Sequence, residues 1–71
     1  MDKFGEKLAI LRKQRGFTLR QLGEILEVHH TFISQIEKGK TTPNARMIIR
    51  IADIFGVTAD QLMRDELELD E

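Results

Sequence analysis

Apolar residues recur with the period of an α-helix in five segments of the chain, separated by short polar or glycine-containing stretches. In the first segment, about residues 2–15, Phe4, Leu8 and Leu11 lie at positions i, i+4 and i+7, and Asp2 is the expected N-cap. No segment shows the alternation of apolar and polar residues that is typical of a β-strand. The pattern therefore predicts a compact, all-α domain of five helices. Its expected core consists of the aliphatic residues on the inner faces of these helices: Leu8, Leu11, Leu22, Ile25, Ile33, Ile36, Ile48, Ile51, Ile54 and Leu62.

Capping residues indicate where the later helices begin. Thr18 and Gln21 have the spacing of a capping box, in which two side chains satisfy two free N–H groups, and they predict a helix at about 19–26. Thr58 and Gln61 repeat this spacing before the last helix, which runs through Met63. Start and stop residues of the same kind place the two helices between them at about 30–37 and 45–55.

Length and composition restrict the classes of protein. The 71 residues suffice for one small domain, which buries only about 60% of the surface that its unfolded chain exposes. The absence of cysteine excludes disulfides and thiolate metal sites. No apolar run approaches the roughly 20 residues that cross a bilayer, and "MDKFGEKLA" lacks the apolar core of a secretory signal. We therefore expect a soluble, cytoplasmic protein.

The formal net charge of −1 is an average over two unlike segments. Residues 1–64 carry 11 Lys and Arg against 7 Asp and Glu, a balance of +4, whereas "DELELDE" at residues 65–71 contributes −5. A basic segment beside an acidic one is a weak indication of nucleic-acid binding. We expect residues 1–64 to form the domain and residues 65–71 to form a frayed acidic tail.

The second and third predicted helices have the spacing of a helix-turn-helix. Gly23, a small residue within the first of them, lets the other helix cross closely. Val28 closes the turn, and Ile33 and Ile36 pin the following helix to the core. In this arrangement the second helix is presented to the major groove of DNA.

Over about residues 4–63 the chain resembles the phage-repressor/Cro-type (Xre-like) helix-turn-helix regulators. The matching stretches are "RKQRGFTLRQLGEIL", "TFISQIEKGK" and "IADIFGVTADQL", which are more specific together than any one alone. The resemblance implies a lambda-repressor-like domain that binds double-stranded DNA sequence-specifically. It implies a transcriptional regulator, usually a homodimeric repressor on a two-fold operator. It implies no enzymatic activity, cofactor, membrane association or small-molecule substrate.

Three residues depart from the pattern of this family. Leu19 stands where the family often has a glutamine that meets a phosphate. Glu27 stands where the turn commonly has glycine, and a non-glycine residue at positive φ costs about 1 kcal/mol. His29 replaces the usual serine or threonine N-cap.

The resemblance also indicates which residues meet DNA. It places His30 and Thr31 at the start of the recognition helix, and Gln35, on the same face, can bond bidentately to adenine. The expected base-reading residues are His30, Thr31, Ser34 and Gln35. The expected phosphate contacts are His29, Arg20, Lys38, Lys40, Thr41, Thr42, Asn44 and Arg46.

Other interpretations of the aromatic residues in this segment stay open. A metal site at His29 and His30 is disfavoured because the chain has no other histidine or cysteine to complete it. A catalytic role lacks a recognisable nucleophile, and the remaining alternative is two solvated surface histidines. Phe32 either covers the groove between the two helices, which we favour, or exposes its ring to DNA.

The same resemblance implies two further contacts. Arg12 and Glu37 match positions that form a structural ion pair between the first and third helices. The dimer contact is expected in the last helix and the tail, through Val57, Leu62, Met63 and Leu67. As alternatives to a repressor, the same fold serves protein-interaction modules, antitoxins and restriction–modification controllers.

Overall fold

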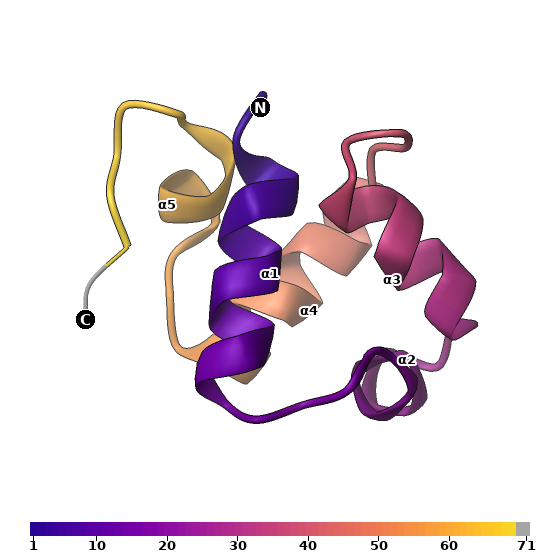
Figure 1. Ribbon diagram of the computed structural model, residues 1–71. Coiled ribbons are helices and arrows are strands. Elements are labelled where there is room, and N and C mark those ends of the chain that lie inside the picture. The colour runs from indigo at the N-terminus through magenta and orange to yellow at the C-terminus, as the bar shows by residue number, and fades with distance from the viewer. Residues whose placement is uncertain (70–71) are drawn as a thin grey trace.

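The computed structural model describes residues 1–69 and contains five helices in this part of the chain. They are α1 (Phe4–Gln14), α2 (Leu19–Leu26), α3 (His30–Glu37), α4 (Ala45–Phe55) and α5 (Ala59–Met63). Helix α1 runs through the middle of the molecule, with α2 and α3 on one side and α5 with the C-terminal segment on the other (Figure 1). The all-α, five-helix prediction is confirmed.

Side-chain caps start four of the helices. The Thr18 hydroxyl accepts from the Gln21 N–H at 3.0 Å and Gln21 Oε1 accepts from the Thr18 N–H at 2.8 Å, which confirms the capping box of α2. Thr58 and Gln61 form the same box at α5. Asn44 Oδ1 caps α4 by accepting from the Met47 N–H at 2.9 Å. At α3, the imidazole of His29 caps the helix.

Helix α1 begins differently from the prediction. Its N-cap is Lys3, which makes no side-chain capping bond, so the assignment of Asp2 as N-cap is wrong. The acceptor comes instead from the far end of the chain. Asp65 accepts from the Lys3 N–H at 2.9 Å and from the Asp2 N–H at 3.1 Å, so a residue beyond α5 supplies the carboxylate that a local cap would supply.

Eight of the ten predicted core residues are buried, and Ile25 and Ile54 are not. Ile54 is half-buried and packs against the core, whereas the side chain of Ile25 is 39% exposed. The buried face of α2 is formed by Leu22, Gly23 and Leu26. Because α3 approaches α2 at Gly23, this face is turned toward residue 23 and away from Ile25.

Two glycines allow α3 to pack closely. A Cβ on Gly23 would lie 2.7 Å from the Val28 carbonyl oxygen, and a Cβ on Gly5 would lie 2.6 Å from the Glu37 carbonyl oxygen. Both distances are shorter than real Cβ contacts. The start of α3 is therefore held against α2 at Gly23, as predicted, and its end against α1 at Gly5.

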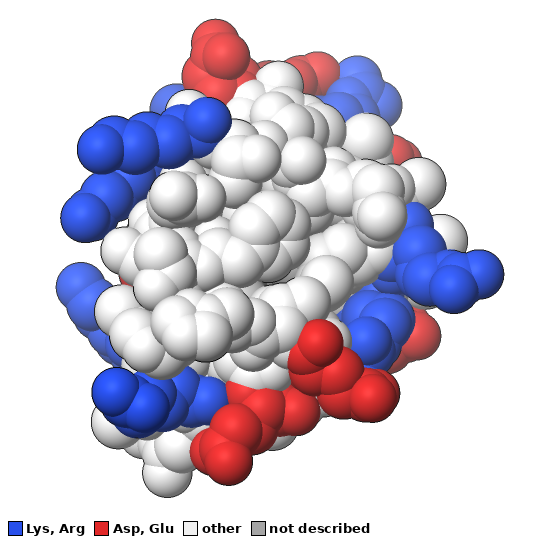
Figure 2. Space-filling view, turned by 90° about the vertical axis from the view of Figure 1, so that its right-hand side faces the viewer, with Lys and Arg blue, Asp and Glu red and all other residues white. Residues whose placement is uncertain are grey.

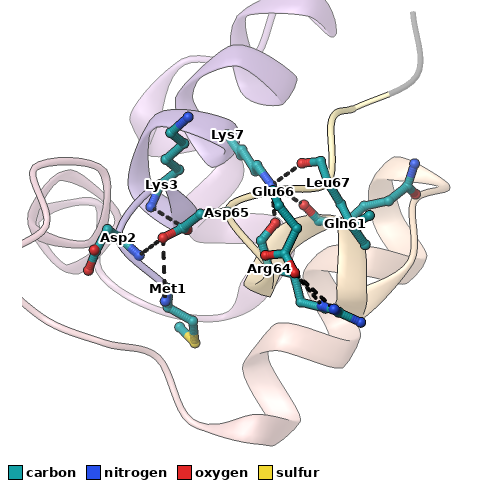
Figure 3. A network of polar contacts seen from close by, with 9 residues as sticks. All are labelled: Met1, Asp2, Lys3, Lys7, Gln61, Arg64, Asp65, Glu66 and Leu67. Carbon is teal, nitrogen blue, oxygen red and sulfur yellow. Dashed lines mark hydrogen bonds and ion pairs between the residues drawn. The ribbon is translucent and has the colours of Figure 1, made fainter.

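A buried lysine fastens the C-terminal segment to α1 (Figure 3). The ammonium group of Lys7, a residue only 6% exposed, donates to the carbonyls of Arg64 at 2.9 Å and Leu67 at 2.6 Å, and also to that of Gln61. These carbonyls lie at the end of α5 and in the turn after it, where a helix lacks its own donors. Lys7 thus caps α5 from α1.

These contacts correct two expectations for the C-terminal segment. Residues 65–69 do not fray, since Asp65 binds the N-terminus and Leu69 packs against the core. Residues 70 and 71 of the predicted tail lie outside the described residues. Leu62 is fully buried within the domain, so its assignment as a dimer contact is wrong. Its side chain is already used in packing α5 onto the core.

We expect Lys7→Met to lower the free energy of unfolding by about 1–3 kcal/mol, because methionine leaves three partly buried carbonyls without their donor. Urea denaturation measures the effect. Lys3→Met, which removes an exposed lysine from the same end of the molecule, is the matched control and should change stability by less than about 0.5 kcal/mol. Equal effects of the two substitutions would contradict the capping role.

Candidate nucleic-acid interface

The turn between α2 and α3 is tight and polar. Glu27 adopts a left-handed conformation with φ of 61°, as the family's glycine position requires, and Val28 packs against the core. His29 then caps α3, since its Nδ1 accepts from the Thr31 N–H at 3.1 Å. An acceptor at Nδ1 places the proton of a neutral imidazole on Nε2. The replacement of serine or threonine by histidine therefore preserves the cap.

The other end of α3 is held by an ion pair. Arg12 on α1 meets Glu37 in a two-pronged contact, Nε to Oε2 at 2.6 Å and Nη2 to Oε1 at 3.1 Å. The two side chains are only 13% and 12% exposed, and Arg12 Nη1 also donates to the Phe17 carbonyl at 2.9 Å. The hydrogen bond with Glu37 raises the pKa of Arg12 above its ordinary value. The predicted structural ion pair is present.

The outward face of α3 is polar and uncharged. Thr31 and Gln35 are exposed, and His30 and Ser34 are half-buried beside them. Phe32 is half-buried and packs against the core, as the favoured interpretation held. Figure 2, which views the molecule from the side where α2 and α3 lie in Figure 1, shows a wide uncharged surface with Lys and Arg along both of its sides.

Cations lie along two sides of this face, and acidic side chains lie at its upper and lower edges (Figure 2). Lys38 and Lys40 follow α3 directly, Arg46 lies in the first turn of α4, and Arg20 lies in the first turn of α2. All four are exposed, and their charged groups make no hydrogen bond or ion pair with another residue among 1–69. Of the other predicted phosphate contacts, His29 lies in the turn before α3 and the remaining three lie in or beside the turn before α4. Thr42 and Asn44 are exposed, Thr41 is half-buried, and Asn44 Oδ1 is engaged as a cap.

The two histidines stack on one another at the N-terminal end of α3. Their ring centroids are 4.3 Å apart with an angle of 30° between the rings. Together with Arg20, Glu24 and Val28 they line a shallow hollow between α2 and α3. Partial burial, with the neighbouring charges of His29 and Arg20, lowers the pKa of His30 below its ordinary value. His30 is therefore predominantly neutral at pH 7 and can act as hydrogen-bond donor or acceptor.

Within residues 1–69 no three histidine, cysteine, aspartate or glutamate side chains come together as a metal site. None of the helices described is long and apolar enough to span a membrane.

Sequence reasoning missed three polar residues that join distant parts of the fold. Lys7 and Asp65 bind backbone groups of segments more than 50 residues away, and Arg50 on α4 binds the end of α2. Lys7 interrupts the inner face of α1 with a long cation, and that interruption is the signal in the sequence that singles it out. Arg50 lies away from the buried face of α4 and carries no such signal.

The fold and the polar face of α3 define a helix-turn-helix domain. The family model for the helix-turn-helix domain matches residues 5–68. The chain belongs to this family, and the resemblance to phage-repressor/Cro-type regulators is confirmed.

Curated relatives are transcriptional regulators. The chain is 42% identical over 64 residues to the HTH-type transcriptional activator BcrR of Enterococcus faecalis, covering 90% of this chain and 31% of that protein. It is 28% identical to the HTH-type transcriptional regulator DdrOP3 of Deinococcus deserti, covering 86% of this chain and 47% of the relative. The chain thus spans less than half the length of either relative.

Solved structures share the whole fold. The P22 c2 repressor in complex with a synthetic operator superposes with a TM-score of 0.82 at 25% identity, covering 89% of this chain and 96% of that one. A transcriptional regulator from Listeria innocua gives a TM-score of 0.82 at 29% identity, covering 96% and 64% of the two chains. The chain is a DNA-binding helix-turn-helix module of the transcriptional-regulator class.

The stacked histidines generate a pH prediction that needs no DNA. The imidazole of His30 should titrate below about pH 6.5 in an NMR titration. Because its folded pKa is lowered, its contribution to stability is complete above the unfolded pKa and is lost as the pH falls through that value toward the folded one. Arg20→Met removes one of the lowering charges and should raise the midpoint. If the midpoint of the His30 titration does not change in Arg20→Met, the charge of Arg20 does not contribute to the lowered pKa.

Proposed function

We propose that this chain acts as a sequence-specific transcriptional regulator that binds double-stranded DNA as a homodimer and represses by occupying a two-fold operator. The observation that carries the proposal is the uncharged polar face of α3, flanked by the four cations that have no partner among residues 1–69. A face of this kind combines base-edge hydrogen bonding at its centre with phosphate neutralisation at its rim.

Helix α3 would enter the major groove, with His30, Thr31, Ser34 and Gln35 toward the bases. Gln35 is exposed and can bond bidentately to adenine N6 and N7, and the methyl of Thr31 can meet a thymine methyl. His30, neutral near pH 7, can donate to guanine or accept from an amino group.

Phosphates would be bound on both sides of the groove. Arg20 lies on the α2 side, and Lys38, Lys40, Thr41 and Thr42 follow α3. Asn44 and Arg46 lie at the start of α4, where the N–H groups and the helix dipole favour an anion. His29 completes the set with its Nε2, because Nδ1 is engaged in the cap.

The dimer contact would involve Met63, which is 37% exposed, and the half-buried Val57 and Leu67. A two-fold pair of such domains presents two α3 helices about 34 Å apart, which matches half-sites one helical turn apart on one face of DNA. We propose repression, not activation, because a dimer bound at a promoter blocks it by occupancy alone. The P22 c2 repressor, whose structure is solved with an operator, has the same domain fold.

In-vitro selection from a random duplex pool at near-physiological salt should enrich a palindrome with half-sites about one turn apart. Sedimentation of the complex on the selected duplex should give two chains per site. Enrichment of a single half-site would remove the homodimer from the proposal. A folded protein that enriches nothing would overturn base reading and favour a protein-interaction module.

Gln35→Ala should relax selectivity at one base-pair position of each half-site and cost about 1–3 kcal/mol on the selected operator. Lys40→Ala should weaken all duplexes alike and reduce the slope of log K against log salt by about 1. Fluorescence anisotropy at several salt concentrations measures both effects. Lys13→Ala, on an exposed position near the end of α1, is the control for loss of a charge away from the proposed interface. Uniform weakening by Gln35→Ala would place that residue outside the base-reading set.

A further inference from the structure

The end of α2 allows a complete account of its hydrogen bonds. The last four carbonyls of an α-helix have no donor within the helix. In α2 these belong to Gly23, Glu24, Ile25 and Leu26. The Gly23 carbonyl accepts from the Val28 N–H at 2.9 Å and the Glu24 carbonyl from the Glu27 N–H at 3.2 Å. The turn into α3 therefore satisfies two of the four carbonyls.

Arg50, which lies on α4, satisfies the other two. Its Nη1 donates to the Leu26 carbonyl at 3.0 Å and its Nη2 to the Ile25 carbonyl at 3.1 Å. The same Nη2 lies 3.7 Å from the Glu27 carboxylate. The guanidinium is planar and its donors point in fixed directions, so contacts with two adjacent carbonyls restrict both the position and the angle of the helix end.

Two unfavourable features of the turn explain why a cation stabilises it. Glu27 is held at positive φ without being glycine, a conformation that is unfavourable for a residue with a Cβ. Its carboxylate also lies at the C-terminal end of α2, where the helix dipole is already negative. The guanidinium of Arg50 offsets both the charge of this carboxylate and the negative end of the helix dipole. The α2–α3 turn is thus stabilised from α4, not only by its own residues.

The direction in which α3 leaves the turn follows from these contacts. Only Glu27, Val28 and the cap His29 separate the end of α2 from the first residue of α3. The helix that carries Arg50 also carries Arg46 one turn earlier, among the proposed phosphate contacts. A shift of Arg50 would therefore move the recognition face relative to the phosphate anchor.

We infer that Arg50 is a positioning residue for base reading: its guanidinium sets the angle of α3 through the carbonyls at the end of α2, and so determines selectivity without reading a base itself. This inference rests on the proposed DNA-binding function. It assigns to Arg50 a role that differs from phosphate binding, although both roles use the same charge.

The test compares Arg50→Met with Lys13→Met, which removes the same charge from an exposed side chain away from the proposed DNA and dimer contacts. Affinities are measured for the selected operator and for a scrambled duplex at several salt concentrations. We expect Arg50→Met to weaken binding to the selected operator about tenfold more than Lys13→Met does. On the scrambled duplex the two variants should be equal, with equal salt slopes. Arg50→Lys should recover part of the selectivity, because an ammonium can donate to the same carbonyls.

Equal weakening of both duplexes by Arg50→Met, with a salt slope reduced by about 1, would identify Arg50 as a phosphate contact and overturn the inference. Amide hydrogen exchange gives a second measurement that does not use DNA. The Glu27 and Val28 amides should exchange faster in Arg50→Met, whereas those of Ile33 and Ile36 should not. If Arg50→Met does not fold, the same comparison between Arg50→Lys and wild type decides. A wild-type protein that selects no sequence would instead overturn the proposed function itself.

Discussion

The placement of α3 depends on the contact between Arg12 and Glu37, which joins this helix to α1. Glu37 is the last residue of α3, and Arg12 also binds the Phe17 carbonyl in the turn before α2, so one guanidinium connects three segments. A half-buried pair of this kind is costly to desolvate, and it is tolerated because most of its donors and acceptors are used. Its benefit is geometric. With the close approaches at Gly5 and Gly23, it fixes where α3 meets α1 and α2.

Contacts between near neighbours in the chain were predictable from residue spacing. Most contacts between distant segments were not, and the Arg12–Glu37 pair was expected from the family resemblance alone. The capping boxes at Thr18 and Thr58 follow from three-residue spacings, and so did the limits of α2 and α3. The cap of α1 was assigned to Asp2 because it is adjacent, yet the acceptor is Asp65, which only the folded chain brings to that end. Ile25 was assigned to the core because it shares a spacing with Leu22. Which side of α2 is buried depends on where α3 crosses it. The outward polar face of α3 was predictable from helical spacing, but its support by Arg50 was not.

Much of the chain's positive charge serves the fold. Lys7 caps the end of α5, Arg50 the end of α2, and Arg15 approaches the Ile54 carbonyl near the end of α4 at 3.4 Å. Each of these cations lies at the negative end of a helix dipole supplied by another part of the chain. The cations that remain without a partner among residues 1–69 include the four around α3. A count of basic residues therefore overstates the positive charge that is available to a phosphate backbone. The basic residues available to it are those whose charged groups have no partner in the described part of the fold.

The net charge of −1 misrepresents the charge near α3 for a related reason. The acidic residues Asp65, Glu66 and Glu68 follow α5, which lies on the opposite side of α1 from α3 (Figure 1). The molecule measures 29 Å along its longest axis, whereas charges are screened over about 8 Å at physiological ionic strength. Nearer to α3, the exposed cations Arg20, Lys38, Lys40 and Arg46 outnumber the exposed carboxylates Glu24 and Glu27 of α2 and its turn. Because Lys7 and Asp65 fasten the acidic segment to the far side, the charge separation is a property of the fold and not of the sequence average.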